Sequence, residues 1–424
     1  MSDFRHPAPG ALIIGGAHGA LAVARSLGRR GIPVFFLTHD NLIAKFSRYV
    51  TASAVWAGPE QPDAAEELLT IGRHNGLEGC ILLPCGDPEV ELVAKNRAIF
   101  SEFFRVITAD WETSKWALDK RLTYQRAASL GIGYPRSFYP RSRLELASLE
   151  CRFPVILKPA SRHSTNAFTQ QKAWQASDFV TLVRRYDQAS ALVGADGVVL
   201  QEMIAGGGEQ QYSYAAVWEH GRPAVSLVAR RTRQYPIHFG FTSTLVQTVD
   251  CPEVEEAGRR FLQSLDYHGI AEVEFKYDAA DGRYKVLDVN ARPWTWIGLG
   301  AAAGVDFPYA LWQLAMGEPV ARAQGRRGAA WMHISRDMVA ACQEMVAGRG
   351  SLAGYLKSFR QPMTFAAFAA DDPLPGLMDL PLLGWRVVTR RLPAFLRSTG
   401  SQIAKELRRV RASLIARLNR HKAC

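Results

Sequence analysis

The sequence predicts an α/β protein with a doubly wound βαβ domain at its N-terminus, a second domain of α+β type, and a helical, basic C-terminal tail. Apolar strands flank an amphipathic helix over residues 11–40, as in a βαβ unit. A β-hairpin with one acidic face is expected over 272–292. After Ser401, cationic side chains border an apolar helical stripe. We therefore expect three parts, at residues 1–114, 115–330 and 331–424.

The composition predicts a globular protein with an ample core. The 424 residues are 48% hydrophobic and 21% charged, which suits two or three domains. The sequence has no run of eighteen apolar residues, so no transmembrane helix is expected. The first residues lack a signal-peptide cleavage pattern. The six cysteines show no metal-binding spacing, so we expect a reducing, cytoplasmic setting.

The N-terminal domain begins with the strand 11–14, a glycine loop at 15–19 and a helix that leads to the strand 33–37. The loop is not GxGxxG and no acidic residue directly ends the second strand, so we expect it to serve close packing more than dinucleotide binding. A helix at 64–75 and another strand follow. Residues 84–87 then lie at a strand's carboxyl end, where α/β sheets bind ligands.

The middle of the chain places a lysine on a buried strand. Residues 153–159 read Phe-Pro-Val-Ile-Leu-Lys-Pro, so Lys158 would point inward, where a charge needs a partner. Lys120 lies on a preceding helix. Further strands are expected at 198–204, ahead of a glycine turn, and at 212–218 and 224–230, with a helix at 253–265.

The acidic hairpin predicts a metal site. With a three-residue loop at 280–282, Glu274 lies opposite Asp288 and Glu272 opposite Asn290. Like charges facing one another across two strands are destabilising, and a hard divalent cation with oxygen ligands relieves them. Taken alone, the hairpin fits an exposed acidic face equally well. The opposite face would pack Ala271, Val273 and Phe275 against Leu287, Val289 and Ala291.

In chain order, five motifs together resemble the ATP-grasp superfamily over roughly residues 115–320. They are Lys120, Val155-Ile-Leu-Lys-Pro159, Gln201-Glu-Met-Ile204 with Gly206 to Glu209, Glu274-Phe275, and Asp288-Val-Asn-Ala-Arg292. The resemblance implies a two-lobed domain that binds ATP and Mg²⁺ after a βαβ domain. It favours the metal site over the exposed acidic face.

The resemblance also implies a role for each motif. Lys120 and Lys158 would neutralise phosphate oxygens, and ion pairs with other acids are their alternative. Asp288 would bridge the metal ions, whose shells Glu274 and Asn290 complete, and Arg292 would face the transferred phosphoryl group. Backbone groups at the strand end Gln201, Glu202, Met203 and Ile204 would bind adenine, and Glu209 the ribose. One of Arg230, Arg231 and Arg233 would stabilise phosphoryl or carboxylate charge, Arg231 and Arg233 sharing a face; a solvated basic strand is the alternative.

Two positions depart from the family pattern. Residues 160–166 read Ala-Ser-Arg-His-Ser-Thr-Asn where the family often has a glycine-rich flap, and Asp288 stands where it usually has Glu. The implied activity is activation of a carboxylate by ATP as an acyl phosphate, which an amine then attacks. The narrower resemblance is to carboxylate–amine ligases like D-aspartate ligase. The alternatives are a catalytically inactive nucleotide-binding regulatory or scaffold protein and, more distantly, a nicotinamide dehydrogenase. The partners would be a small carboxylate and an amine, and the sequence does not specify the oligomeric state.

The tail holds nearly all of the net charge of +11. Residues 385–424 contain eleven Lys/Arg and one acid, Glu406, hence +10, which leaves +1 for the first 384 residues, so specific nucleic-acid binding by the core is not expected. An apolar helical stripe runs beside these charges, which favours peripheral attachment to an anionic inner-membrane surface. Docking on the protein body or on a second subunit is the alternative. The stripe consists of Ile403, Leu407, Val410, Leu414 and Leu418.

Overall fold

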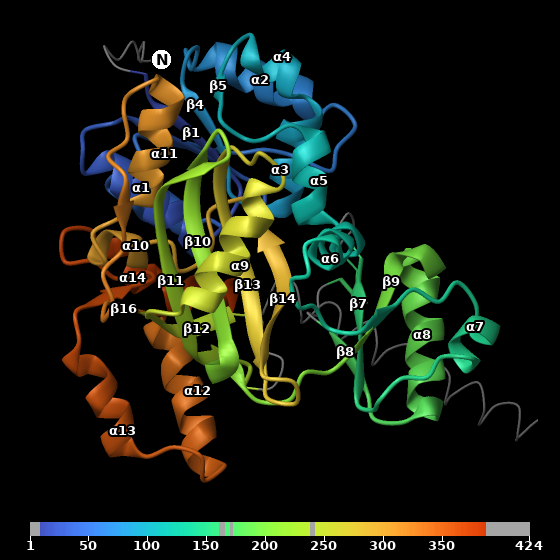
Figure 1. Cartoon of the computed structure of the whole chain (residues 1–424). Coiled ribbons are helices and arrows are strands. Elements are labelled where there is room, and N and C mark those ends of the chain that lie inside the picture. Colours follow the sequence, from blue (N-terminus) through green and yellow to red (C-terminus); the bar gives the residue numbers. More distant parts are fainter. Residues whose placement is uncertain (1–8, 161–165, 170–172, 238–241, 387–424) are drawn as a thin grey trace, which may run out of the picture. The chain divides into compact units, whose positions relative to one another are not determined.

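The computed structural model describes residues 9–160, 166–169, 173–237 and 242–386 (Figure 1). It contains two compact units, residues 1–376 and 377–424. Of the second unit only Leu377 to Arg386 are described, so the expected basic helix after Ser401 lies outside the described residues. None of the described helices is long and apolar enough to cross a membrane. The three domain boundaries expected from the sequence stay predictions.

The N-terminal part is a five-stranded parallel sheet in the order β3-β2-β1-β4-β5. The order reverses between β1 and β4, so the loops after these two strands border the same crevice. Gly15 and Gly16 in the first loop have φ of 69° and 78°, which favours glycine. A Cβ at Gly15 would come within 2.1 Å of a carboxylate oxygen of Glu89, so the loop lies close to this side chain of α3. The elements are β1 (Ala11–Ile14), α1 (His18–Gly28), β2 (Val34–Thr38), β3 (Ala52–Val55), α2 (Ala64–His74), β4 (Ile81–Pro84), α3 (Asp87–Lys95), α4 (Arg97–Ser101) and β5 (Arg105–Val106).

Two short helices lead to a smaller antiparallel sheet in the order β6-β9-β7-β8 (Figure 1). Its core packs Val155, Leu157 and Leu200 against Leu182 and Tyr186 of the helix α8, all fully or almost fully buried. Apolar residues at i and i+4 on α8 form the stripe that makes this contact. The elements are α5 (Trp111–Leu118), α6 (Lys120–Ser129), β6 (Ser137–Phe138), α7 (Arg143–Ala147), β7 (Val155–Pro159), β8 (Trp174–Ala176), α8 (Phe179–Val193) and β9 (Val198–Glu202).

The larger sheet has the order β14-β13-β10-β11-β12-β16-β17, and β15 pairs with β11. The helix α9 lies across β10 and β11 (Figure 1) and buries Val254, Phe261 and Leu262 against Tyr214 and Trp218. These elements are β10 (Gln211–Glu219), β11 (Arg222–Tyr235), β12 (Thr242–Thr248), α9 (Pro252–Gln263), β13 (Gly269–Asp278), β14 (Arg283–Asn290), α10 (Leu299–Ala302), α11 (Phe307–Met316), β15 (Ala323–Gln324), β16 (Ala330–Met332) and β17 (Met363–Phe365).

The acidic hairpin, β13 and β14, has the predicted pairs but not the predicted loop. Glu272 lies opposite Asn290 and Glu274 opposite Asp288, as expected. The strands, however, close at Asp278 and Arg283, so the loop is one residue longer than the three expected. A bulge compensates, because Phe275 pairs with Val286 and leaves Leu287 without an opposite residue on β13. The expected packing of Phe275 against Leu287 is therefore wrong.

The region after residue 330 is more regular than the sequence indicated. The prolines and glycines of the stretch 360–384 predict an irregular structure, but the stretch contains β17 and most of α14 (Leu374–Arg386). Between β16 and β17 the chain forms α12 (Ile334–Val346) and α13 (Leu352–Lys357). Short strands and helices with few turn signals are hard to find from periodicity alone.

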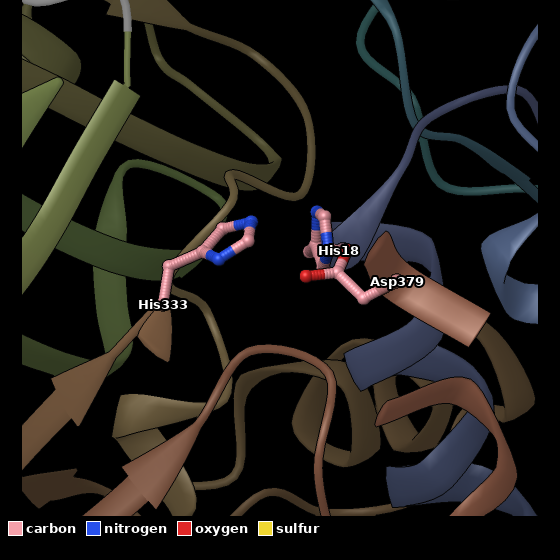
Figure 2. Close-up of side chains that lie close together, drawn as sticks. All are labelled: His18, His333 and Asp379. Atoms are coloured by element: carbon pink, nitrogen blue, oxygen red, sulfur yellow. The ribbon is translucent and has the colours of Figure 1, made fainter. Parts of the chain in front are cut away.

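This region is anchored on the N-terminal sheet by buried polar contacts. Arg25 of α1 donates from Nε to Asp372 Oδ2 at 2.9 Å, and both side chains are almost fully buried. The rings of His18 and His333 also meet, with centroids 4.4 Å apart (Figure 2). Asp379, also labelled in Figure 2, belongs to the second unit. Residues at the two ends of the first unit thus hold one another in place.

Candidate active site

The acidic face of the hairpin lines a cavity of about 170 Å³. Its walls come from β13 and the end of β14, from β11 and β12, and from the segment after Arg292. The N-terminal part contributes the start of the helix α3. The acids are therefore not on an open surface. The charged and amide side chains that line the cavity are Asp87, Glu91, Lys120, Arg231, Glu272, Glu274, Asp288, Asn290 and Arg292.

Two glutamates and an amide form the floor of this cavity. Asn290 donates from Nδ2 to Glu272 Oε2 at 3.0 Å and to Glu274 Oε1 at 3.2 Å. Ser213 donates to Glu272 Oε1 at 2.8 Å. Burial, and then the charge of Glu274, raise the pKa of Glu272 to about 8. Burial beside a second carboxylate thus favours the protonated form of Glu272.

Three cations surround these acids. Lys120 Nζ lies 2.9 Å from Asp288 Oδ1, and Arg231 Nη2 lies 3.5 Å from Glu274 Oε2. Arg292 donates from Nε to Asp87 Oδ1 at 2.5 Å and from Nη2 to Asn290 Oδ1 at 3.1 Å. Burial alone would lower the pKa of Arg292, but the charge and hydrogen bond of Asp87 raise it, so the guanidinium stays charged.

The donor set fits a hard divalent cation. Glu274 and Asp288 offer carboxylate oxygens from opposite strands, and Glu272 adds another once it loses its proton. The amide oxygen of Asn290 accepts from Arg292 in this arrangement. This hydrogen bond occupies one of the two lone pairs of the Asn290 amide oxygen and leaves the second for another partner.

Arg231 and Arg233 of β11 do not share a face of the sheet, contrary to the prediction. The pairing with β12 shifts between them, since Arg231 lies opposite Val246 and Arg233 opposite Leu245, which leaves Thr232 as an extra residue. Arg233 instead makes two hydrogen bonds to Asp337 of α12, at 3.0 and 2.7 Å. Arg230 donates to the Glu209 carbonyl. Of the three, only Arg231 lines the acidic cavity among the described residues.

A second, larger cavity of about 880 Å³ lies beside the end of β9. Met203, Ile204 and Glu209, three of the residues predicted to bind adenosine, line it, whereas Gln201 and Glu202 do not. Lys276 donates to the carbonyl oxygens of Ile204 and Gly206, which fixes the turn. The far wall comes from α12 and α13, which periodicity did not reveal. That wall consists of Ala340, Ala341, Glu344, Met345, Arg349, Gly350, Ser351, Gly354 and Tyr355.

Other predicted site residues contact the protein itself. Lys158 is buried on β7 and donates to Gln201 Oε1 at 2.9 Å. The Glu202 carboxylate accepts from the Arg152 backbone at 3.0 Å and pairs with Arg136 at 3.3 Å, so its side chain faces away from the larger cavity. Neither contact tests the phosphate and adenine roles expected for this strand pair.

Neither Asp87 nor Glu272 was predicted from the sequence to be a residue of the acidic site. Asp87 lies at the carboxyl end of β4, in the stretch where a ligand was expected, and its contact is with Arg292, 205 residues away. Glu272 was placed opposite Asn290 but not counted as a ligand. Its position two residues before Glu274 on the same strand face was a usable signal.

The chain is similar to known ligases in sequence and in fold. No protein-family model matches the sequence. A D-aspartate ligase of Enterococcus faecium (strain Aus0004) is 22% identical over 263 residues, which cover 58% of this chain and 62% of that relative. The chain thus spans less than two thirds of that relative's length.

Solved structures of ligases and carboxylases have the same fold. An L-amino acid ligase from Bacillus licheniformis matches with a TM-score of 0.55 at 16% identity, over 72% of this chain and 74% of that one. The biotin carboxylase domain of Hydrogenobacter thermophilus 2-oxoglutarate carboxylase, in complex with MgADP and bicarbonate, matches with a TM-score of 0.58 at 16% identity, over 75% and 73%. The resemblance found in the sequence is thereby confirmed, and the chain has the fold of the ATP-grasp ligases.

Proposed function

We propose that the protein is an ATP- and Mg²⁺-dependent ligase that joins a carboxylate to an amine. The main support is the acidic cavity, in which Glu272, Glu274 and Asp288 face Lys120, Arg231 and Arg292. Such a mixture of acids and cations suits a metal-bound polyphosphate beside a carboxylate. The similarity to named ligases is the second support.

In this reaction the side chains mainly position charges. Lys120, which binds Asp288 here, turns to a phosphate oxygen of the nucleotide. Arg231 and Arg292 hold the oxygens of the substrate carboxylate and of the transferred phosphoryl group. The carboxylate attacks the γ-phosphorus of ATP, ADP leaves, and an amine then displaces phosphate from the acyl phosphate.

Glu274 and Asp288 would hold Mg²⁺, with Glu272 and Asn290 beside them. The metal ion would screen the phosphate charge and bridge the nucleotide to the hairpin. The adenosine would occupy the larger cavity beside Met203 and Ile204, with Glu209 near the ribose.

We propose an amino acid as one substrate. The acidic cavity carries the cationic groups of Lys120, Arg231 and Arg292, which suit a substrate carboxylate. Two matched proteins are named as ligases of amino acids, one of them of D-aspartate.

The proposal can be tested by incubating the protein with ATP, Mg²⁺ and a panel of D- and L-amino acids and measuring the release of phosphate. Each amino acid is tested as the carboxylate donor and as the amine acceptor. Asp288→Ala should abolish substrate-dependent release. Asp281→Ala, in the exposed hairpin loop, is the matched control and should retain it. Tight nucleotide binding without turnover across the panel would favour the inactive regulatory or scaffold alternative instead.

We further propose that the protein is cytoplasmic and that its tail attaches it to an anionic membrane surface. The support is the charge of +10 over residues 385–424, with about 1 kcal/mol per cation near such a surface. Removal of 385–424 should release the protein from vesicles that contain phosphatidylserine. Equal binding of the truncated and full-length proteins would contradict the tail's role.

A further inference from the structure

A chain of buried hydrogen bonds connects the smaller sheet to the acidic hairpin. Lys158 Nζ donates to Gln201 Oε1 at 2.9 Å, Gln201 Nε2 donates to the Tyr124 hydroxyl at 3.0 Å, and Tyr124 donates to the Leu287 carbonyl oxygen at 2.9 Å. Gln201 and Tyr124 are each 1% exposed. The chain thus begins at the predicted phosphate-binding lysine and ends one residue before Asp288.

The direction of every bond in this chain is determined. A lysine ammonium can only donate, so the amide oxygen of Gln201 must face Lys158 and its NH₂ group must face Tyr124. The Tyr124 hydroxyl then accepts from Gln201 and has its own proton free for Leu287. Burial raises the pKa of Tyr124, so this proton is retained at physiological pH.

The last acceptor belongs to the bulge residue of β14. If the pairing from Phe275–Val286 continued without a bulge, Asp288 would lie opposite Val273 on the core face. The extra residue Leu287 turns Asp288 and Asn290 to the face of Glu274 and Glu272. Tyr124 holds the carbonyl of that extra residue.

The same helix also holds the side chain that follows the bulge. Lys120 lies one turn before Tyr124 on α6, so both point to one side of the helix. Lys120 binds Asp288 and Tyr124 binds Leu287, which are consecutive residues. Two adjacent turns of α6 therefore clamp the bulge.

We propose that Tyr124 and Gln201 are positioning residues that hold Lys158 and the bulged strand before Asp288 in one fixed arrangement. The inference rests on the proposed function, in which Lys158 and Asp288 act on the same metal-bound nucleotide. Neither Tyr124 nor the side chain of Gln201 then touches the nucleotide, and both act through their partners.

A double-mutant cycle on MgADP binding tests the proposal. Tyr124→Phe and Gln201→Leu should each weaken MgADP binding about tenfold, because each breaks the connection between Lys158 and Leu287; Gln201→Leu also removes the hydrogen bond from Gln201 to Ser137. The double variant should also lose about tenfold rather than a hundredfold, because either change breaks the same chain. Tyr134→Phe is the control: its ring stacks on Tyr124 at 6.0 Å, and binding should be unchanged.

Two further measurements separate positioning from general destabilisation. In turnover, Tyr124→Phe should raise the KM for MgATP about tenfold and leave the KM for the carboxylate unchanged. In the nucleotide-free protein, Tyr124→Phe should accelerate hydrogen exchange at the Asp288 amide. Exchange in the helix α8, which packs on the smaller sheet, should not change. Wild-type binding and exchange in Tyr124→Phe would overturn the inference. If the wild-type protein does not bind MgADP, the proposed function fails, and the exchange at Asp288 still decides the inference.

Discussion

Asp371 and Asp372 are neighbours in the sequence and bind two arginines four residues apart, Arg29 just after α1 and Arg25 within it, yet only Asp372 is buried. Asp371 pairs with Arg29 at 2.7 Å, with both side chains 43% exposed. Asp372 is 2% exposed and accepts from Arg25, from the Ser47 hydroxyl and from the Arg48 backbone. The two positions therefore form a matched pair for measuring how strongly the C-terminal region is anchored.

Asp372→Ala should lower the free energy of unfolding by about 3–5 kcal/mol, because it leaves Arg25 buried without its partner. Asp371→Ala should cost less than about 1 kcal/mol, as for an exposed ion pair. Urea denaturation of both variants provides the measurement. Equal losses would show that the buried pair does not anchor this region.

Arg231→Ala should mainly lower kcat, whereas Arg233→Ala should mainly lower the free energy of unfolding. Arg231 lies at the acidic cavity, so its loss should reduce kcat about a hundredfold, as for removal of a charge-stabilising donor. Arg233 holds the fully buried Asp337, so its loss should lower the free energy of unfolding by about 3 kcal/mol. Steady-state kinetics and denaturation of the same preparations distinguish the two, and a larger kinetic defect in Arg233→Ala would contradict the assignment.

Stability should fall as the pH rises through the titration of Glu89. Burial, followed by the charges of Asp40 and Asp87, raises the pKa of Glu89 from 4.5 to about 7. Between these values the folded state binds a proton that the unfolded state does not, so the free energy of unfolding decreases with pH by up to about 3 kcal/mol. Glu89→Gln should match the wild type near pH 4.5 and exceed its stability at pH 8. A constant difference between the proteins at pH 4.5 and pH 8 would refute this origin.

Nucleotide should stabilise the protein only with its metal ion. MgADP at a hundred times its Kd should raise the free energy of unfolding by about 2.7 kcal/mol. ADP with a chelator should stabilise much less, because Glu274 and Asp288 then repel the phosphates. Glu274→Gln should weaken the Mg²⁺-dependent part of the thermal shift, and Glu91→Gln, in the same cavity but paired with Lys95, should not. Equal stabilisation with and without Mg²⁺ would argue against a metal site on the hairpin.

The sequence was informative where a pattern is local. The strand 11–14 and the helix after residue 64 follow from apolar periodicity, and the pairing of Glu274 with Asp288 follows from alternation. Order and spacing of five weak motifs identified the ATP-grasp fold, although each motif alone is common.

The rest depends on contacts that no local pattern records. The bulges at Leu287 and Thr232 change which side chains share a face, and they arise from pairing with other strands and with Tyr124. The ion pair of Arg292 with Asp87 joins residues 205 positions apart. The α12–α13 wall of the larger cavity is fixed by packing on β11 and by the ion pair of Asp337 with Arg233.

The longer hairpin loop and the extra residue at Leu287 constrain insertions and deletions in this segment. Deletion of Leu287 would remove the bulge and still leave Asp288 opposite Glu274, whereas one residue inserted into β14 between Asp288 and Asn290 would move Asn290 to the opposite face of the strand. A residue added in the loop between Asp278 and Arg283 can leave these pairs in place, because the loop lies outside the paired strands. A homologue or an engineered variant can therefore vary the loop in length, whereas a single insertion in β14 after Asp288 separates Asp288 and Asn290 onto opposite faces.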